Sequence, residues 1–249
     1  MLIVGNWKAY VETRAKAKAL YQGAKRLAAK GTHEIVVASP FPYLGMLAPA
    51  RSGKTDPLFA AQDVSRTVGG AQTGEVTAGL LKELGVTYVL VGHSERRAQG
   101  ESDALVLEKV RHVLAHGMVP IVCVGERARD VDALYLKEVR VQVESIFRQL
   151  STKERLQVVI AYEPIWAIGK TGADAITPVD LREMVLYIRK VLAEHMPGRA
   201  NQKVRILYGG SVEAGNIRTL AGGGTVDGFL VGHASTDVVG FSALVKALD

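Results

Sequence analysis

The sequence predicts an α/β fold, a (β/α)8 barrel of eight parallel strands surrounded by helices, formed by residues 1–249 as one domain. The chain has 249 residues, and one barrel of this kind uses roughly 250. Short apolar runs rich in β-branched residues recur eight times, with helical segments between them. No proline- or serine-rich linker divides the chain. Alternation alone also fits a doubly wound open sheet, and the count of eight favours the barrel.

The eight expected strands share a short length, β-branched residues and flanking glycine or proline, which are typical of buried strands. They are Leu2–Asn6, Ile35–Ser39, Leu58–Ala61, Tyr88–Val91, Val119–Val124, Val158–Ala161, Val204–Tyr208 and Gly228–Val231.

The segments between the strands have helical periodicity and recognisable ends. Ser102 and the Thr177-Pro178 pair are start signals, and Gly31, Gly85 and Gly117 follow expected helix ends. The expected helices are Glu12–Lys30, Tyr43–Ala50, Thr77–Leu84, Asp103–His116, Val131–Leu150, Pro178–His195, Glu213–Ala221 and Ser235–Leu248.

Composition excludes several classes of protein. An apolar content of 48% and a net charge of +6 argue against disorder. Cys123 is the single cysteine, so no disulfide framework forms within the chain. The apolar run Met1–Val4 is too short for a signal peptide, and no stretch approaches the roughly 18 apolar residues of a membrane span. We therefore expect a cytoplasmic protein that does not associate with membranes.

The basic residues do not form a nucleic-acid footprint. Lysine and arginine are spread along expected helices, as in Lys16–Lys30, and alternate elsewhere with acidic residues. Nucleic acid is therefore not an expected partner. The excess of positive charge gives a mild bias toward small anionic substrates.

Polar residues follow five of the expected strands at the point where each strand ends. Asn6 and Lys8 follow the first strand, His93–Glu95 the fourth and Glu163 the sixth. Glycine-rich turns follow the seventh and eighth strands, at Gly209–Ser211 and Gly232-His233. Carboxyl ends of parallel barrel strands meet on one face, where barrel enzymes place their catalytic groups. This convergence predicts an enzyme.

Three of these side chains suit proton transfer next to a carbonyl group. Glu163 precedes Pro164, which keeps it extended, and a desolvated carboxylate there is a good base for a carbon acid. His93 stands at a short helix start, which favours a neutral imidazole, and Lys8 supplies positive charge for an oxyanion. The residues alone leave open a capping or salt-bridging glutamate, a structural histidine and a surface lysine.

The two glycine-rich turns are candidate phosphate sites. Each leads toward a helix, and backbone N–H groups at helix starts bind anions. Barrels often bind phosphate after strands seven and eight, although tight turns also use glycine for positive φ. The apolar loop 164–172 beside Glu163 is either packed permanently or a lid that closes over substrate.

No cofactor or metal is expected. The segments Gly53–Thr55 and Gly169–Thr171 lack the upstream glycine of a nucleotide-binding phosphate loop. His112 and His116 share a helix face, yet no carboxylate or cysteine at matching spacing completes a metal site. Cys123 lies in an apolar strand and indicates core packing.

Several segments together resemble the triosephosphate isomerase family, and the match runs nearly end to end. The segments, in chain order, are Gly5-Asn6-Trp7-Lys8, Thr73-Gly74-Glu75, Gly92-His93-Ser94-Glu95-Arg96-Arg97, Val122-Cys123-Val124-Gly125-Glu126, 161–169 and Tyr208-Gly209-Gly210-Ser211-Val212.

The resemblance implies interconversion of D-glyceraldehyde 3-phosphate and dihydroxyacetone phosphate through an enediol(ate), in glycolysis and gluconeogenesis, without a cofactor. It implies that Glu163 carries the proton and neutral His93 polarises the carbonyl. Lys8 and Asn6 would stabilise the oxyanion and contact the substrate, with Glu95 as a supporting carboxylate.

For the phosphate, the resemblance implies four backbone N–H donors, those of Gly169, Ser211, Gly232 and His233. It also implies that the loop 164–172 is the lid and that the protein is a homodimer. The loop around Thr73, Gly74 and Glu75 would dock beside the partner's catalytic asparagine and lysine.

The sequence departs from the family in four places. The usual Gly-Gly pair after strand eight is replaced by Gly232-His233, and the end of the lid, Gly169–Ala173, reads Gly-Lys-Thr-Gly-Ala instead of the commoner Gly-Thr-Gly-Lys-Thr. Segment Arg97–Glu101 is one residue shorter than usual, and Gln72 stands where an aromatic residue is often found before Thr-Gly-Glu. We expect the His233 imidazole to point away from the site.

Two other functions compete with the triose reaction. One is a tetrulose-phosphate isomerase with an altered phosphate pocket, and the other is a non-catalytic barrel scaffold. A scaffold has no need of Asn6, Lys8, His93 and Glu163 together. The Asn-Trp-Lys triplet and the apolar lid sequence favour the triose substrate.

Overall fold

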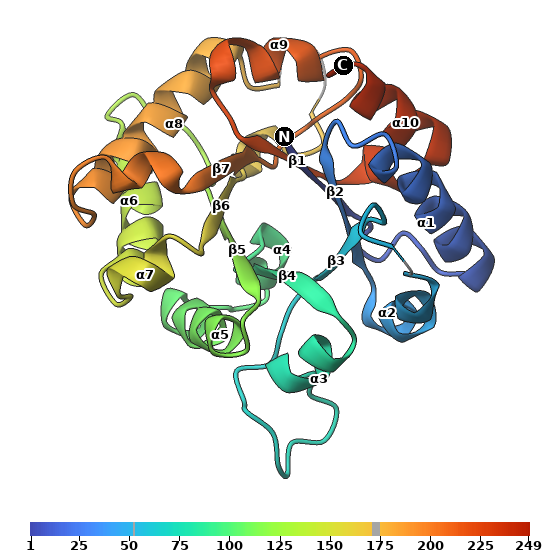
Figure 1. Cartoon of the computed structure of the whole chain (residues 1–249). Helices are drawn as coiled ribbons and strands as arrows, with labels where there is room; N and C mark the ends of the chain where they lie inside the picture. The colour runs from blue at the N-terminus through green and yellow to red at the C-terminus, as the bar shows by residue number, and fades with distance from the viewer. Residues whose placement is uncertain (52, 171–174) are drawn as a thin grey trace.

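The computed structural model describes residues 1–51, 53–170 and 175–249, and its strands close into a barrel in the order β1 to β8 (Figure 1). Every neighbouring pair is parallel, which confirms the predicted (β/α)8 barrel. The strands are β1 (Leu2–Asn6), β2 (Glu34–Ser39), β3 (Leu58–Ala61), β4 (Val86–Val91), β5 (Val119–Val124), β6 (Val159–Tyr162), β7 (Arg205–Tyr208) and β8 (Gly228–Val231).

The first and last strands close the barrel by pairing with each other. In that register Leu2 lies opposite Gly228. A Cβ atom on Gly228 would lie 1.9 Å from the carbonyl oxygen of Leu2. Closure of the barrel therefore requires glycine at this position.

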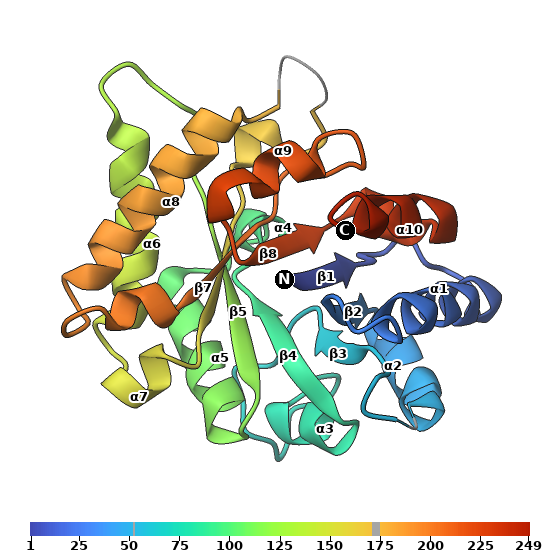
Figure 2. The same ribbon diagram turned by 45° about the horizontal axis from the view of Figure 1, so that its top comes forward.

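The helices surround the strands, as Figure 2 shows for α1, α6, α8 and α10. The α-helices are α1 (Arg14–Ala28), α2 (Phe41–Leu47), α3 (Ala78–Glu83), α4 (Ser94–Ala98), α5 (Asp103–Ala115), α6 (Leu134–Phe147), α7 (Thr152–Arg155), α8 (Pro178–Ala193), α9 (Ile217–Ala221) and α10 (Val238–Lys246). Short 3₁₀ helices that matter for the site are η2 (Ile165–Ala167) and η6 (His233–Thr236).

Two apolar layers hold the fold together. Side chains that point into the barrel, among them Val4, Leu90 and Ile121, form a compact inner cluster. Alternate strand residues such as Ile3 point outward and pack against the helices in a larger cluster. The strands are buried on both faces, which explains why each appears in the sequence as an almost continuous apolar run.

A polar group lies at the amino ends of the strands. Tyr88 is 3% exposed, and its hydroxyl donates to Glu34 Oε1 over 2.5 Å. Arg205 bonds both residues, with Nη1 at 3.0 Å from Glu34 Oε2 and Nη2 at 2.7 Å from the Tyr88 hydroxyl. This group ties β2, β4 and β7 together at the end of the barrel opposite the polar strand ends.

Replacing Tyr88 with phenylalanine is expected to lower the free energy of unfolding at pH 7 by about 1–3 kcal/mol, because Glu34 and Arg205 each lose a partner. Burial, followed by the hydrogen bond to Glu34, raises the pKa of Tyr88 from 10.0 to about 12. The folded protein holds this proton more tightly, so the stabilisation is complete below pH 10 and is lost between pH 10 and about 12.

Denaturant unfolding at pH 7, 9.5 and 11.5 tests both statements. The alkaline loss of stability should be smaller in the Tyr88→Phe variant than in the wild type. An equal loss in the two proteins would contradict the assignment of this titration to Tyr88.

Several predicted helices begin later than expected, and a capping side chain or the local backbone conformation explains the difference. The helix predicted from Glu12 begins at Arg14 because Thr13 is its N-cap and accepts from the N–H of Lys16. The helix predicted from Val131 begins at Leu134, because the preceding Ala133 has a left-handed φ of +55°.

The segments after β7 and β8 also differ from the prediction. Helix α9 begins at Ile217 instead of Glu213, because the Asn216 side chain accepts from the N–H of Glu213 and holds a turn. The helix predicted from Ser235 begins at Val238, where Asp237 caps it, and η6 precedes it. The prediction missed α7, although the Ser151–Glu154 capping box is a recognisable sequence signal.

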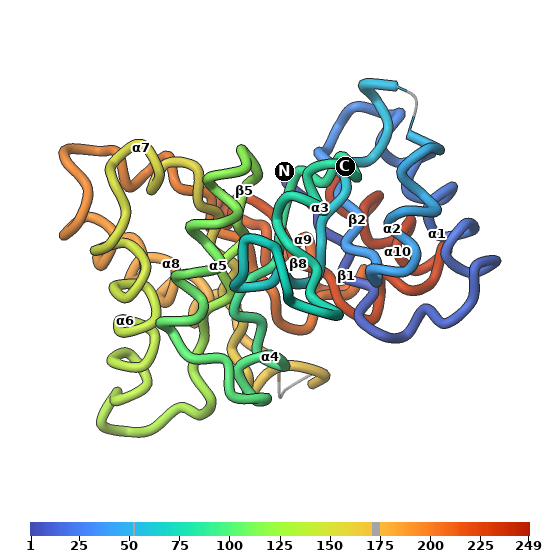
Figure 3. The backbone as a smooth tube through the Cα atoms, turned by 90° about the horizontal axis from the view of Figure 1, so that it is seen from below, coloured from blue at the N-terminus to red at the C-terminus, as the bar shows by residue number. Residues whose placement is uncertain are grey.

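The two ends of the chain lie close together (Figure 3). His33 bridges them, with Nδ1 at 3.4 Å from the Met1 amino group and Nε2 at 3.3 Å from Asp249 Oδ1. Within the ranges the structure describes, no helix combines the length and apolar character that crossing a membrane needs.

Candidate active site

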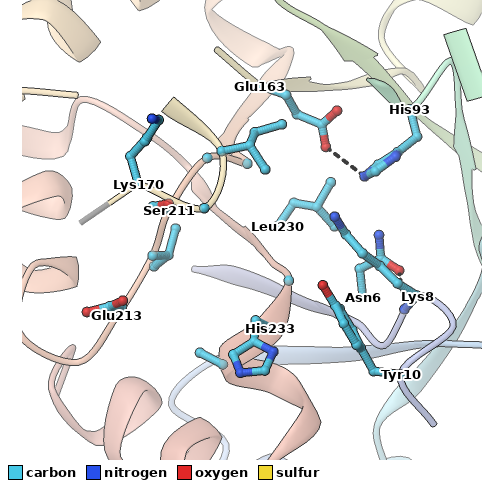
Figure 4. A pocket seen from close by; sticks show the side chains of 17 residues that line it. Asn6, Lys8, Tyr10, His93, Glu163, Lys170, Ser211, Glu213, Leu230 and His233 are labelled. Atoms are coloured by element: carbon cyan, nitrogen blue, oxygen red, sulfur yellow. Dashed lines mark hydrogen bonds and ion pairs between the residues drawn. The ribbon is translucent and has the colours of Figure 1, made fainter. Parts of the chain in front are cut away.

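A cavity of about 410 Å³ opens at the carboxyl ends of the strands. It brings together the expected site residues except Glu95, namely Asn6, Lys8, His93, Glu163, Gly169, Ser211, Gly232 and His233. Figure 4 shows the Glu163 and His93 side chains facing each other, with Lys8 and Asn6 on one side and Ser211 on the other. The predicted convergence of these residues on one face is confirmed by this geometry.

Glu163 lies directly after β6 and is 2% exposed. Its Oε1 lies 3.3 Å from His93 Nε2, and its Oε2 accepts from the N–H of Ser94 at 3.3 Å. The Ser94 N–H belongs to the first turn of α4, which favours negative charge. The carboxylate is thus desolvated and has few hydrogen-bond partners, as a general base requires.

His93 is the N-cap of α4, and its hydrogen bonds define the tautomer. Nδ1 accepts a hydrogen bond from the N–H of Glu95 at 3.2 Å. A nitrogen that accepts from a backbone N–H carries no proton, so the remaining ring proton is on Nε2. This neutral imidazole directs its N–H into the cavity, which agrees with the electrophile expected from the sequence.

Lys8 and Asn6 are held in place by backbone contacts. Lys8 has a left-handed φ of +46°, an uncommon conformation for a residue with a side chain. The Asn6 Oδ1 accepts from the Lys8 N–H at 3.0 Å, and the Gln62 amide donates to the Lys8 carbonyl at 3.1 Å. The Asn6 side-chain oxygen accepts this backbone bond, and the NH2 group of the same amide can donate to a ligand.

Glu95 does not line the cavity but contacts a residue that does. Its Oε1 lies 2.7 Å from Lys8 Nζ, and its side chain is 57% exposed. This arrangement suits the supporting role that the resemblance implies, because the carboxylate orients the ammonium group. An exposed ion pair contributes little stability, at most about 1 kcal/mol.

The turn after β7 lies against the Glu163 side chain. A Cβ atom on Gly209 would lie 2.8 Å from Glu163 Cγ, and one on Gly210 would lie 2.2 Å from the Tyr208 hydroxyl. Ser211 Oγ donates to the Ala167 carbonyl at 3.0 Å, which joins this turn to the segment after Glu163. The glycines here provide space for neighbouring groups.

Gly209→Ala is expected to lower kcat by about 10- to 100-fold, because the new methyl group displaces the Glu163 carboxylate. Gly215→Ala is the matched control, since nothing lies within 4 Å of its Cβ position. Steady-state kinetics and thermal unfolding of both variants test this. Equal kcat values in the two folded variants would contradict the steric contact.

His233 lies at the edge of the cavity and is exposed, and no contact of its ring with Glu163 or His93 is found among the described residues. It lines the cavity, and its ring packs edge-on against the Tyr10 ring with centroids 5.4 Å apart (Figure 4). Tyr10 comes from the loop after β1, so this aromatic contact bridges the loops that carry Lys8 and Gly232. The backbone at His233 is not left-handed, and its N–H remains at the start of η6.

The lid prediction falls partly outside the described residues. Residues 164–170 are described, and Thr171, Gly172 and Ala173 lie outside. The 3₁₀ helix η2 covers Ile165–Ala167, and Ile168, Gly169 and Lys170 line the cavity.

Glu126, which the sequence analysis names only as part of a motif, contacts the chain on both sides of Glu163. It is fully buried, and its Oε1 accepts from both the Tyr162 hydroxyl and Trp166 Nε1 at 2.8 Å. Its carbonyl accepts from the N–H of Ile165 at 2.9 Å. One residue therefore holds the chain on both sides of Glu163.

Two buried groups beside the site remain protonated. Burial, followed by the Glu126 carboxylate, raises the pKa of Tyr162 well above its usual range, so its hydroxyl donates at all working pH values. Burial, followed by the charge of Glu163, likewise raises the pKa of the Cys123 thiol. Cys123 packs inside the barrel, as predicted, and is not a reactive thiolate.

Among the described residues, one group away from the cavity offers three potential metal ligands, Glu144, Glu194 and His195. Arg140 already bonds both carboxylates, at 2.7 Å to Glu144 and at 2.7 and 2.8 Å to Glu194. This group fits an arginine-centred contact between α6 and α8 better than a metal site. The paired histidines His112 and His116 are not part of it.

Comparison with known proteins gives the family. The sequence model of the family described as "Triosephosphate isomerase" matches residues 1–248. The chain belongs to the triosephosphate isomerase family. The resemblance seen in the separate motifs thus extends over the whole barrel, from β1 to α10.

Individual members of the triosephosphate isomerase family align over nearly their full length. Proteins named triosephosphate isomerase from Moorella thermoacetica and Thermus thermophilus are 41% and 42% identical. The first alignment covers 98% of this chain and 97% of the relative, and the second covers 99% and 98%. A protein of the same name from Cupriavidus necator is 41% identical over 99% of this chain and 98% of the relative.

Proposed function

We propose that this chain catalyses the triosephosphate isomerase reaction, the interconversion of D-glyceraldehyde 3-phosphate and dihydroxyacetone phosphate. Family membership over residues 1–248 supports the reaction. The observation that carries the mechanism is the 3.3 Å approach of the desolvated Glu163 carboxylate to His93 Nε2 within one cavity. A base and an electrophile at that separation can act on neighbouring atoms of one small substrate.

Glu163 takes a proton from C1 of dihydroxyacetone phosphate, and the electron pair of that C–H bond forms the C1–C2 double bond. The C2 carbonyl oxygen gains the negative charge, and His93 Nε2–H donates to it. Glu163 returns its proton to C2, and His93 relays the hydroxyl proton from O1 to the charged oxygen on C2, which gives the aldehyde at C1 and a hydroxyl group at C2. In the reverse direction the same groups exchange roles.

The charge that develops on oxygen is stabilised by Lys8 and Asn6. The ammonium group of Lys8 and the free amino group of Asn6 line the same cavity as His93. Both are fixed before substrate binds, so little reorganisation is needed in the transition state. Glu95 keeps the Lys8 ammonium oriented through the 2.7 Å ion pair.

Backbone N–H groups hold the phosphate on the side of the cavity opposite Lys8 and Asn6. We assign this role to Gly169, Ser211, Gly232 and His233, which line the cavity on the Ser211 side and along η6. Dipoles of oriented N–H groups favour a dianion. No metal or cofactor is part of this mechanism.

Assays with a triose phosphate and a tetrulose phosphate, together with deuterium labelling, distinguish the candidate reactions. A coupled assay with D-glyceraldehyde 3-phosphate is expected to give kcat/KM near the diffusional range of about 10⁸ M⁻¹s⁻¹. Reaction in deuterated water should place deuterium on the carbon that receives the proton from Glu163. A preference for a tetrulose phosphate would favour the paralogue reaction, and no turnover of either substrate would favour the scaffold.

The same proposal includes a homodimer, one domain over residues 1–249 and a cytoplasmic location. The loop between β3 and α3 projects outward from the barrel (Figure 1), and its Val68 is 75% exposed. Thr73, Gly74 and Glu75 lie on this exposed loop. Thr73→Arg is expected to shift the protein toward monomers in light scattering. A dimer of unchanged stability would contradict docking through this loop.

A further inference from the structure

Arg129 lies behind the active site and contacts the residue that holds Glu163 in place. Its Nε is 3.5 Å from Glu126 Oε1, and its Nη1 donates to Asp180 Oδ1 over 2.8 Å. Its guanidinium carbon lies 5.2 Å from the centre of the Trp166 ring and 5.2 Å from that of Tyr135. Arg129 therefore joins the loop after β5, the start of α8 and the segment after Glu163.

The Glu126 carboxylate needs a positive charge nearby. Its side chain is 0% exposed, and apart from Arg129 its described donors are the neutral groups of Tyr162 and Trp166. A buried carboxylate without a cation is strongly destabilised and takes up a proton or moves. Within the described residues, Arg129 is the cationic side chain that forms an ion pair with Glu126.

We propose that Arg129 is a positioning residue for the base Glu163, acting through the charge of Glu126 and through Trp166. The inference rests on the proposed function, in which Glu163 transfers the proton. Glu126 contacts Tyr162 on one side of the base and Ile165 and Trp166 on the other. Loss of the cation loosens both sides at once and displaces the Glu163 carboxylate.

A second feature makes this role specific to arginine. A planar guanidinium group stacks on an aromatic ring and bonds carboxylates at its edge, whereas an ammonium group does only the second well. Asp180 holds the guanidinium from the far side, and Trp166 covers its face. Lysine at this position can restore the charge but not the contact with the ring.

Kinetics of three variants test the proposal. Arg129→Gln is expected to lower kcat by about 10- to 100-fold with KM changed less than about threefold, because the base is misplaced while the phosphate end is untouched. Arg129→Lys should recover part of kcat. Arg127→Gln, on the same loop with an 84% exposed side chain, is the matched control and should behave as the wild type.

A double variant separates the charge of Arg129 from a general structural role. Glutamine at position 126 keeps an oxygen that accepts from Tyr162 and Trp166 and needs no cation. The Arg129→Gln, Glu126→Gln pair should therefore have a higher kcat than Arg129→Gln alone. An equal or lower kcat in the pair would overturn the proposal, as would a wild-type kcat in Arg129→Gln.

Tryptophan fluorescence gives a readout that does not depend on activity. The chain has two tryptophans, and Trp7 is 2% exposed and far along the chain from Arg129. Emission in Arg129→Gln should shift to longer wavelength as Trp166 loses its cover, and Trp166→Phe should abolish the shift. Unchanged emission overturns the proposal even where kcat falls. If the wild type fails to isomerise triose phosphates, the proposed function fails, and this spectroscopic test still decides the contacts of Arg129.

Discussion

Glu163→Gln is expected to lower kcat by about 10³- to 10⁴-fold with little change in KM, the upper part of the range for removing a general base. Glutamine has nearly the same shape, and its amide oxygen can keep one of the two contacts that the carboxylate makes with His93 Nε2–H and the Ser94 N–H. What it lacks is the ability to accept a proton from carbon. The loss should therefore fall on the chemical step and leave substrate binding almost unchanged.

The measurement is the coupled steady-state assay, combined with deuterium exchange into dihydroxyacetone phosphate. Both the isomerisation and the exchange should fall together in Glu163→Gln. Glu108→Gln, an exposed carboxylate on α5, is the control and should retain wild-type values. Exchange that persists in Glu163→Gln would show that another group removes the proton.

The barrel could be predicted because its strands are buried on both faces. Leu2–Asn6, Val119–Val124 and Gly228–Val231 have the bounds that their apolar runs predict. Strand β4 begins at Val86 instead of Tyr88, because its first residues join the sheet through pairing with Phe59, a long-range contact. Pairing between residues so far apart in the chain cannot be recognised from the local sequence.

The catalytic face could also be predicted, because the carboxyl ends of parallel strands meet. This rule alone places Lys8, His93 and Glu163 together, and the structure shows them around one cavity. The tautomer of His93 needed the structure, because it depends on the N–H of Glu95 reaching Nδ1. The close approach of Gly209 to Glu163 likewise depends on how β6 and β7 lie side by side.

The residues behind the site could not be predicted from the sequence. Glu126 reaches Tyr162, which lies 36 positions further along the chain, and Arg129 reaches Asp180 across 51 positions. In the sequence, the loop after β5 that carries Glu126 and Arg129 looks like an ordinary polar connection. The position of His233 is a similar case, since its contact with Tyr10 joins the first and last loops of the barrel.

Lys8→Met is expected to lower kcat/KM by about 10³- to 10⁴-fold, because the variant loses the cation that faces both the enediolate and the dianionic substrate. Lys8 Nζ is bound to Glu95 at 2.7 Å, and the backbone of Lys8 is fixed by Asn6. Methionine fills a similar volume, so the barrel should stay folded. Lys18→Met, on the exposed face of α1, is the control.

The division of the Lys8 effect between kcat and KM is the decisive result. In the proposed mechanism Glu163 carries the proton, so its replacement should affect kcat alone. Lys8 should affect both constants, because its charge attracts the substrate before it stabilises the transition state. Removing the ammonium also leaves Glu95 without its partner, but that carboxylate is 57% exposed and is hydrated at little cost. Glu95→Gln should consequently lower kcat/KM less than about tenfold, because Lys8 keeps its charge and its backbone contacts. A larger loss in Glu95→Gln than in Lys8→Met would mean that the carboxylate, and not the ammonium group, contacts the reacting atoms.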